Sequence, residues 1–92
     1  MIIRIFSDGQ YRIPQDAQAR LHELDVETVH AIDANDEAGF AKSYGALLEH
    51  IHASGERLDD DELEPSDLML PPPDITLEEA REEFTGEGLI PD

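Results

Sequence analysis

The chain has no cysteine and no tryptophan, and its aromatic residues make up only 5% of the sequence. Without cysteine it forms neither a disulfide nor a zinc–thiolate site. No apolar run approaches the roughly 18 residues that a transmembrane helix needs. No secretory signal pattern opens the sequence either. These absences predict a cytoplasmic protein without disulfides and without a zinc–thiolate site.

Basic residues are scarce: six against 23 acidic ones, which gives a net charge of −17. The imbalance is concentrated at the end, where residues 59–92 carry 13 acidic side chains and one basic one. Direct binding to nucleic acid or to an anionic lipid surface is disfavoured, because both need positive charge. Lys42 is the only lysine. Abundant acid with scarce lysine predicts a halophilic protein, whose self-repulsion is screened by molar salt.

The length and the apolar content of the chain are sufficient for one small folded domain. The 92 residues set the size of a single domain, 1–92, and Leu, Ile, Val and Phe supply 25% of them. That share exceeds the roughly 20% below which highly charged chains are expected to be disordered. A polar, acidic loop is predicted at 55–66.

Two strands are predicted at the start of the chain. Residues 2–6 and 10–13 are rich in β-branched and aromatic side chains, and Asp8-Gly9 between them is a hairpin turn signal. A lone hairpin is unstable, so it needs further partners. Residues 67–70, in which Leu68 and Leu70 lie on one side as in a half-buried strand, are expected to add a third strand.

Helical spacing begins at Asp16, with a stripe that includes Leu21, Leu24, Thr28 and Ile32. Asp25 is expected to divide this stretch into two short helices. The next helix is the clearest element, with Asn35 or Asp36 as its N-cap and Ser54-Gly55 as its end. Its apolar stripe consists of Phe40, Tyr44, Leu47, Leu48 and Ile51. A short connection predicts that the two stretches pack as an antiparallel pair.

A third helix is predicted after the prolines at 71–73. Thr76 followed three residues later by Glu79 is a capping box, so the helix should begin at about Leu77. The predicted fold is therefore α+β: an N-terminal β-hairpin, an antiparallel helical pair, a short third strand and a C-terminal helix.

No pattern typical of catalysis is found. There is no nucleophile elbow around any serine and no glycine-rich phosphate loop, so neither an enzyme nor a cofactor is expected. His50 and His52 do not share a helix face, and His22 and His30 are two turns apart. No metal site is therefore expected from them. The acidic run 59–64 lacks the spaced ligands of a calcium loop, although a divalent-ion sensor there stays an alternative.

Several segments, in this order, resemble the phage-shock-protein-A-associated (PspAA) domain family. They are MIIRI at 1–5, GQYRI at 9–13, ANDEAGF at 34–40, ELEPSDLMLP at 62–71 and GLIP at 88–91. The resemblance spans nearly the whole chain and implies a small, non-catalytic partner of PspA, a coiled-coil protein of the PspA/Vipp1 class that protects the inner membrane. It carries no motif of functional residues. The chain departs from the family in its extra acidity, notably at residues 59–62.

The resemblance implies an adaptor or regulator in the membrane-stress response, located in the cytoplasm and peripheral to the inner membrane only through its partner. Residues 59–64 form an acidic lip that could steer a basic face of the partner. The other candidate protein-binding surface is an apolar ridge with the tail of the chain, Leu68, Leu70, Pro71, Leu89 and Ile90, together with the adjoining Asp67 and Pro91.

Besides the divalent-ion sensor, two alternatives remain open at this point. One is an acidic mimic of nucleic acid that sequesters a nucleic-acid-binding protein, recognisable by the partner it binds. The other concerns assembly: an exposed edge of the N-terminal hairpin would permit a strand-to-strand homodimer.

Overall fold

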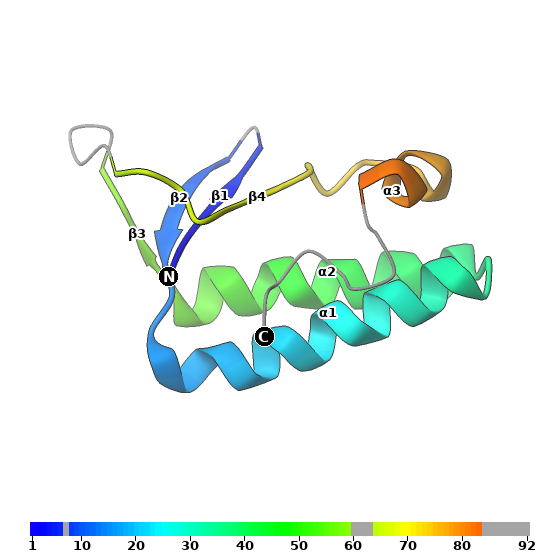
Figure 1. The fold of residues 1–92 in the computed structure, drawn as a ribbon, viewed down its shortest axis with the longest axis horizontal. Coiled ribbons are helices and arrows are strands. Elements are labelled where there is room, and N and C mark those ends of the chain that lie inside the picture. Colours follow the sequence, from blue (N-terminus) through cyan, green and yellow to red (C-terminus); the bar gives the residue numbers. More distant parts are fainter. Residues whose placement is uncertain (7, 60–63, 84–92) are drawn as a thin grey trace.

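The computed structural model describes residues 1–6, 8–59 and 64–83. Two long helices form one layer, and a small sheet and a third helix lie over the same side of that layer (Figure 1). The sheet covers one end of the helical pair and the short helix covers the other end. This confirms the predicted α+β class.

The hairpin is present as predicted. Strands β1 (Ile2–Ile5) and β2 (Gly9–Arg12) pair antiparallel, with Ile3 opposite Tyr11. Ile3 and Ile5 point into the core, whereas Arg4 between them is exposed, as the two-residue period of a strand requires. The hairpin therefore has one buried face and one open face.

The predicted third strand is β4 (Leu68–Leu70), which pairs parallel with β1. Sequence analysis missed a fourth strand, β3 (Glu56–Arg57), which pairs antiparallel with β2 inside the segment predicted as loop. The sheet order is β3-β2-β1-β4. Both outer sides of the hairpin are thus paired, so an edge-to-edge dimer would have to use β3 or β4.

A 3-10 turn, η1 (Gln15–Ala17), leads into α1 (Gln18–Asp33). The expected break at Asp25 is wrong: α1 is continuous, and Asp25 is fully buried within it. Three residues on, the hydroxyl of buried Thr28 donates to the carbonyl of Leu24 at 2.7 Å, so that polar side chain is satisfied within the helix. The predicted apolar stripe of α1 does face the core.

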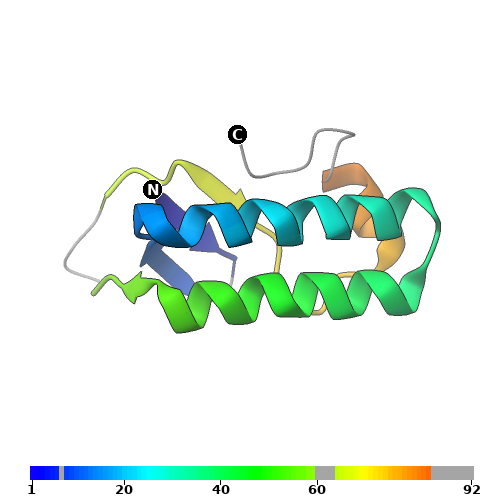
Figure 2. The same ribbon diagram turned by 90° about the horizontal axis from the view of Figure 1, so that it is seen from below.

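Helix α2 (Glu37–Ser54) begins and ends where the sequence predicts. Asp36 is the N-cap, because its carboxylate accepts the N–H of Gly39 at 3.0 Å. Asn35 adopts φ 56°, the left-handed conformation in which Asn is common after a helix. All five residues of the predicted stripe are buried, and Figure 2, which views the molecule from below, shows α1 and α2 side by side in front of the sheet.

The capping box is also confirmed. Thr76 N–H donates to the Glu79 carboxylate at 3.0 Å, and Glu79 N–H donates to the Thr76 hydroxyl at 3.2 Å. These two hydrogen bonds mark the start of α3 (Leu77–Glu83), in which Ala80 is fully buried. Arg81 donates to Asn35 Oδ1 at 2.6 Å, which ties α3 to the α1–α2 connection.

Candidate partner-binding groove

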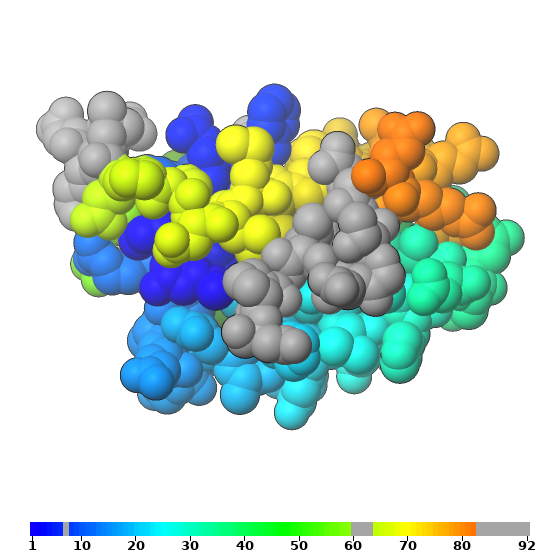
Figure 3. Space-filling model, viewed as in Figure 1, coloured from blue at the N-terminus to red at the C-terminus, as the bar shows by residue number. Residues whose placement is uncertain are grey.

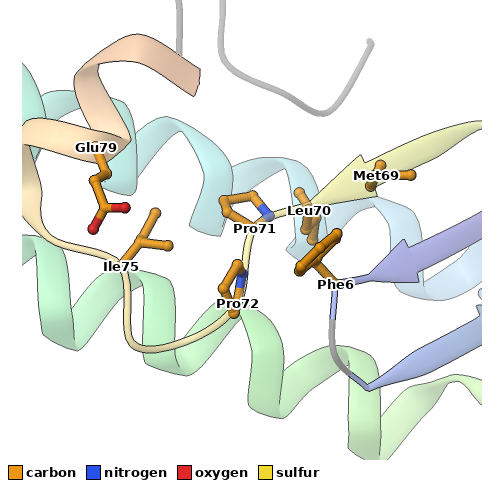
Figure 4. Close-up of a pocket in the computed structure, with 7 residues that line it drawn as sticks. All are labelled: Phe6, Met69, Leu70, Pro71, Pro72, Ile75 and Glu79. Carbon is orange, nitrogen blue, oxygen red and sulfur yellow. The ribbon is translucent and has the colours of Figure 1, made fainter.

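An open groove of about 470 Å³ lies between the end of the sheet and the start of α3. Its walls are mostly apolar, as Figure 4 shows: Phe6, Met69, Leu70, Pro71, Pro72, Ile75 and Glu79. Phe6 and Met69 lie at one end and Glu79 at the other, with the prolines and Ile75 between them. In Figure 3 the yellow segment of β4 and the following prolines separates the blue N-terminal strands from the orange α3. We call this site the groove.

Two large side chains of the groove are unusually exposed. Phe6 is 57% exposed and Met69 is 56% exposed, and with Val26 they are the large hydrophobic residues exposed within the described part of the chain. Strand alternation is the cause: Ile5 and Leu70 occupy the inward positions, so Phe6 and Met69 point outward. Aromatic residues and methionine are enriched where proteins meet partners.

The middle of the groove is stiff. Prolines at 71–73 have a fixed φ and cannot extend the sheet. The hydroxyl of Tyr44, on α2, donates to the carbonyl of Pro71 and so anchors this segment to the helical layer. Tyr44 is itself 2% exposed and stacks on Phe40. The groove is therefore preformed rather than assembled from loose loops, which lowers the entropic cost of binding.

The predicted ridge residues fall in different places. Leu70 is fully buried, so its side chain belongs to the core, and Leu68 is half-buried. Asp67 is exposed, and its carboxylate accepts the N–H of Ile2 at 2.8 Å, which holds the start of β4 against β1. Pro71 lines the groove. Leu89, Ile90 and Pro91 lie outside the described residues.

Phe6, Met69 and Ile75 were missed as candidate binding residues. A signal for Met69 was present, because a strand that points Leu68 and Leu70 inward must point Met69 outward. The same alternation could have identified Phe6, because a strand that points Ile3 and Ile5 inward must point Phe6 outward. Ile75 offered none, since its position depends on the path of the proline segment.

The acidic lip is described only at its ends. Asp59 and Glu64 are exposed, while residues 60–63 lie outside the described part. Glu64 pairs with Arg12 at 3.2 Å, and Glu56 lies 3.7 Å from the same arginine. The charge of Arg12 is thus largely compensated within the protein.

A polar cluster holds the hairpin turn to α2. The Asp8 carboxylate contacts His52 Nε2 at 2.6 Å and accepts from Arg57 and the Tyr11 hydroxyl, each at 3.1 Å. The hydrogen bond from His52 lowers the pKa of Asp8, although burial opposes this shift. Burial raises the pKa of Tyr11, and its hydrogen bond to Asp8 adds to that shift. The cluster is a structural tie between β2, β3 and the last turn of α2.

Metal ligands do not gather in the described structure: no group of three or more His, Asp or Glu residues in 1–6, 8–59 and 64–83 could hold an ion. His50 Nε2 lies 3.0 Å from the carbonyl of Ala17 and thereby links α2 to η1. No helix of the described part is long and apolar enough to cross a membrane.

The comparisons with known proteins gave one result. A family model described as PspA-Associated protein matches residues 1–92. No curated protein and no solved structure matches the chain.

Proposed function

The chain belongs to the PspA-associated family over its whole length, and on that premise we propose that it is a non-catalytic adaptor that binds a coiled-coil protein of the PspA/Vipp1 class. The observation that carries this proposal is the groove, in which exposed Phe6 and Met69 lie at one end of a stiff proline wall. An apolar groove of this kind suits the apolar face of an amphipathic helix.

The chemistry of the groove supports a binding role over a catalytic one. Glu79 is its ionisable residue, and that carboxylate already accepts the N–H of Thr76. The remaining walls offer apolar surface, which stabilises a complex through burial but does not activate a substrate. We therefore assign no reaction to the protein.

The net charge of −17 supports an indirect relation to membranes. An anionic lipid surface repels a strongly acidic protein, so association with the membrane would come through the partner. A regulatory role in the membrane-stress response follows if the adaptor changes the assembly of that partner.

The proposal is tested by measuring the affinity of the protein for the PspA-class protein of the same organism, by titration calorimetry. We expect the double variant Phe6→Ala, Met69→Ala to bind at least about tenfold more weakly, because truncation of a central anchor typically costs more than 1 kcal/mol. Val26→Ala is the matched control, since Val26 is also exposed but lies on α1 outside the groove.

The control should bind within about twofold of the wild type. Circular dichroism melts would show that both variants keep the fold. Undiminished binding by the double variant would remove the groove from the proposal, and absence of binding by the wild type would refute the adaptor role itself.

A further inference from the structure

We propose that Arg4 supplies a positive charge at the border of the groove, and that the segment seated in the groove is an amphipathic helix with an acidic side chain beside its apolar stripe. This inference rests on the proposed function and specifies the chemistry of the partner. It assigns to a highly acidic protein a site that selects an acidic ligand.

The position of Arg4 follows from the strand register. On β1 it stands directly opposite Gln10 of β2 and Met69 of β4. Phe6 is two residues further on, so it shares the open face of the sheet with Arg4. Both Met69 and Phe6 line the groove, and both lie at the end away from Glu79 (Figure 4). Arg4 therefore borders the exposed aromatic and methionine end of the groove.

The charge of Arg4 is uncompensated within the described structure. The other described arginines have close partners: Arg12 pairs with Glu64, Arg20 with Glu23, Arg57 with Asp8, and Arg81 bonds to Asn35. Arg4 is exposed and forms no ion pair with any described residue, and the residues directly opposite it, Gln10 and Met69, are neutral. The nearby carboxylate of Asp67 is bonded to the N–H of Ile2. Among the described residues of so acidic a chain, a positive charge without an ion-pair partner beside an apolar groove is a distinctive feature.

This arrangement determines what a ligand must carry. A helix that covers Phe6 and Met69 would remove water from the adjacent guanidinium, and an unpaired buried charge is costly. A carboxylate on the ligand removes that cost, because the planar guanidinium matches a carboxylate with two parallel hydrogen bonds. A basic or purely apolar ligand leaves Arg4 unpaired. The end near Glu79 has the opposite sign, so the direction of the helix is also specified.

A second copy of this chain is a poorer occupant. Each copy carries a net charge of −17, so bringing two copies face to face adds like-charge repulsion. A separate amphipathic helix need not carry that charge.

The test is a double-mutant cycle with model peptides. Two designed helical peptides share one leucine stripe and differ only in the residues beside it, which are Glu in one and Gln in the other. Their affinities are measured by fluorescence anisotropy for the wild type, Arg4→Gln and Lys42→Gln. Lys42 is the matched control, because it lies on α2 outside the groove and its loss changes the net charge equally.

In Arg4→Gln we expect the affinity for the Glu peptide to fall about fivefold relative to the affinity for the Gln peptide. A change of this size corresponds to the loss of one well-placed, partly exposed ion pair. Lys42→Gln should leave the ratio unchanged. Equal shifts in both variants would show only the effect of net charge and would overturn the inference, as would no shift in either.

The remaining outcomes separate this inference from the adaptor role. If neither peptide binds while the PspA-class protein does, the inference is wrong and the adaptor role stands. If the peptides show the Arg4 coupling but the PspA-class protein does not bind, the surface is real and its proposed partner is wrong. Sedimentation of the same samples would detect a dimer through the groove, which would also overturn the inference.

Discussion

Replacing Leu70 and its neighbour Met69 by alanine, one at a time, tests the register of β4. The two residues are adjacent in the strand and similar in size, yet Leu70 is fully buried and Met69 is 56% exposed. Their environments should therefore give very different costs for the same truncation. A slip of one residue would exchange the two side chains between the core and the groove.

The magnitudes follow from burial. Truncating a fully buried leucine removes apolar contacts and leaves a cavity, at about 3 kcal/mol. A domain of this size is stable by roughly 5–14 kcal/mol, so Leu70→Ala should remove a large share of the stability. Its melting temperature should fall by about 12–24 °C. Met69→Ala leaves no enclosed cavity and should cost about 0.5 kcal/mol, or a few degrees.

The assay is urea and thermal unfolding followed by circular dichroism. Both variants should shift the urea midpoint without changing the slope, because the surface exposed on unfolding stays nearly the same. Equal destabilisation by the two substitutions, or a larger loss with Met69→Ala, would refute the register and with it the groove as described.

Two further predictions concern charge. The hydrogen bond from His52 lowers the pKa of Asp8 in the folded protein. The stability that the Asp8–His52 contact contributes is therefore fully present above the ordinary carboxyl pKa, and it is lost as the pH falls through the lowered pKa of the folded state. In Asp8→Asn the free energy of unfolding, measured by urea unfolding, should therefore change less between about pH 2 and pH 5 than in the wild type. The same pH dependence in both proteins would contradict a stabilising contact between Asp8 and His52. The net charge of −17 predicts that the wild-type melting temperature rises between about 0.1 M and 2 M KCl, whereas equal values would argue against salt-dependent folding.

Local signals made much of the fold predictable. The Asp36 cap and the Thr76–Glu79 box each specify a boundary through contacts only a few residues long, and both occur in the structure. The Asp8-Gly9 signal predicted the hairpin, which is present with Gly9 as the first residue of β2. The stripe of α2 was equally clear because every member lies on one face. Where neighbouring residues determine the conformation, the sequence was sufficient.

The predictions were wrong where contacts between residues far apart in the sequence determine the structure. Helix α1 continues through Asp25 because its apolar stripe packs into the core on both sides of that residue, which overrides the low helix propensity of aspartate. Strand β3 has two residues and exists through pairing with Tyr11 and Arg12, far away in the sequence. Close packing also governs the turn before it: a side chain on Gly55 would collide with Ile13.

The candidate site was predicted only in part for the same reason. Pro71 was identified from the sequence, and the exposure of Met69 followed from the predicted strand. The groove exists because the parallel pairing of β1 and β4 brings Phe6 next to residues 69–79, and no local sequence pattern specifies that pairing.

That pairing links recognition to the lifetime of the protein. The groove draws its walls from both ends of the described chain, so it does not exist in an unfolded or half-folded copy. A ligand that binds there at a hundred times its dissociation constant would add about 2.7 kcal/mol to the stability of a small domain. Copies without a partner would unfold more often and be degraded first, so the cellular amount of this protein would follow the amount of its partner.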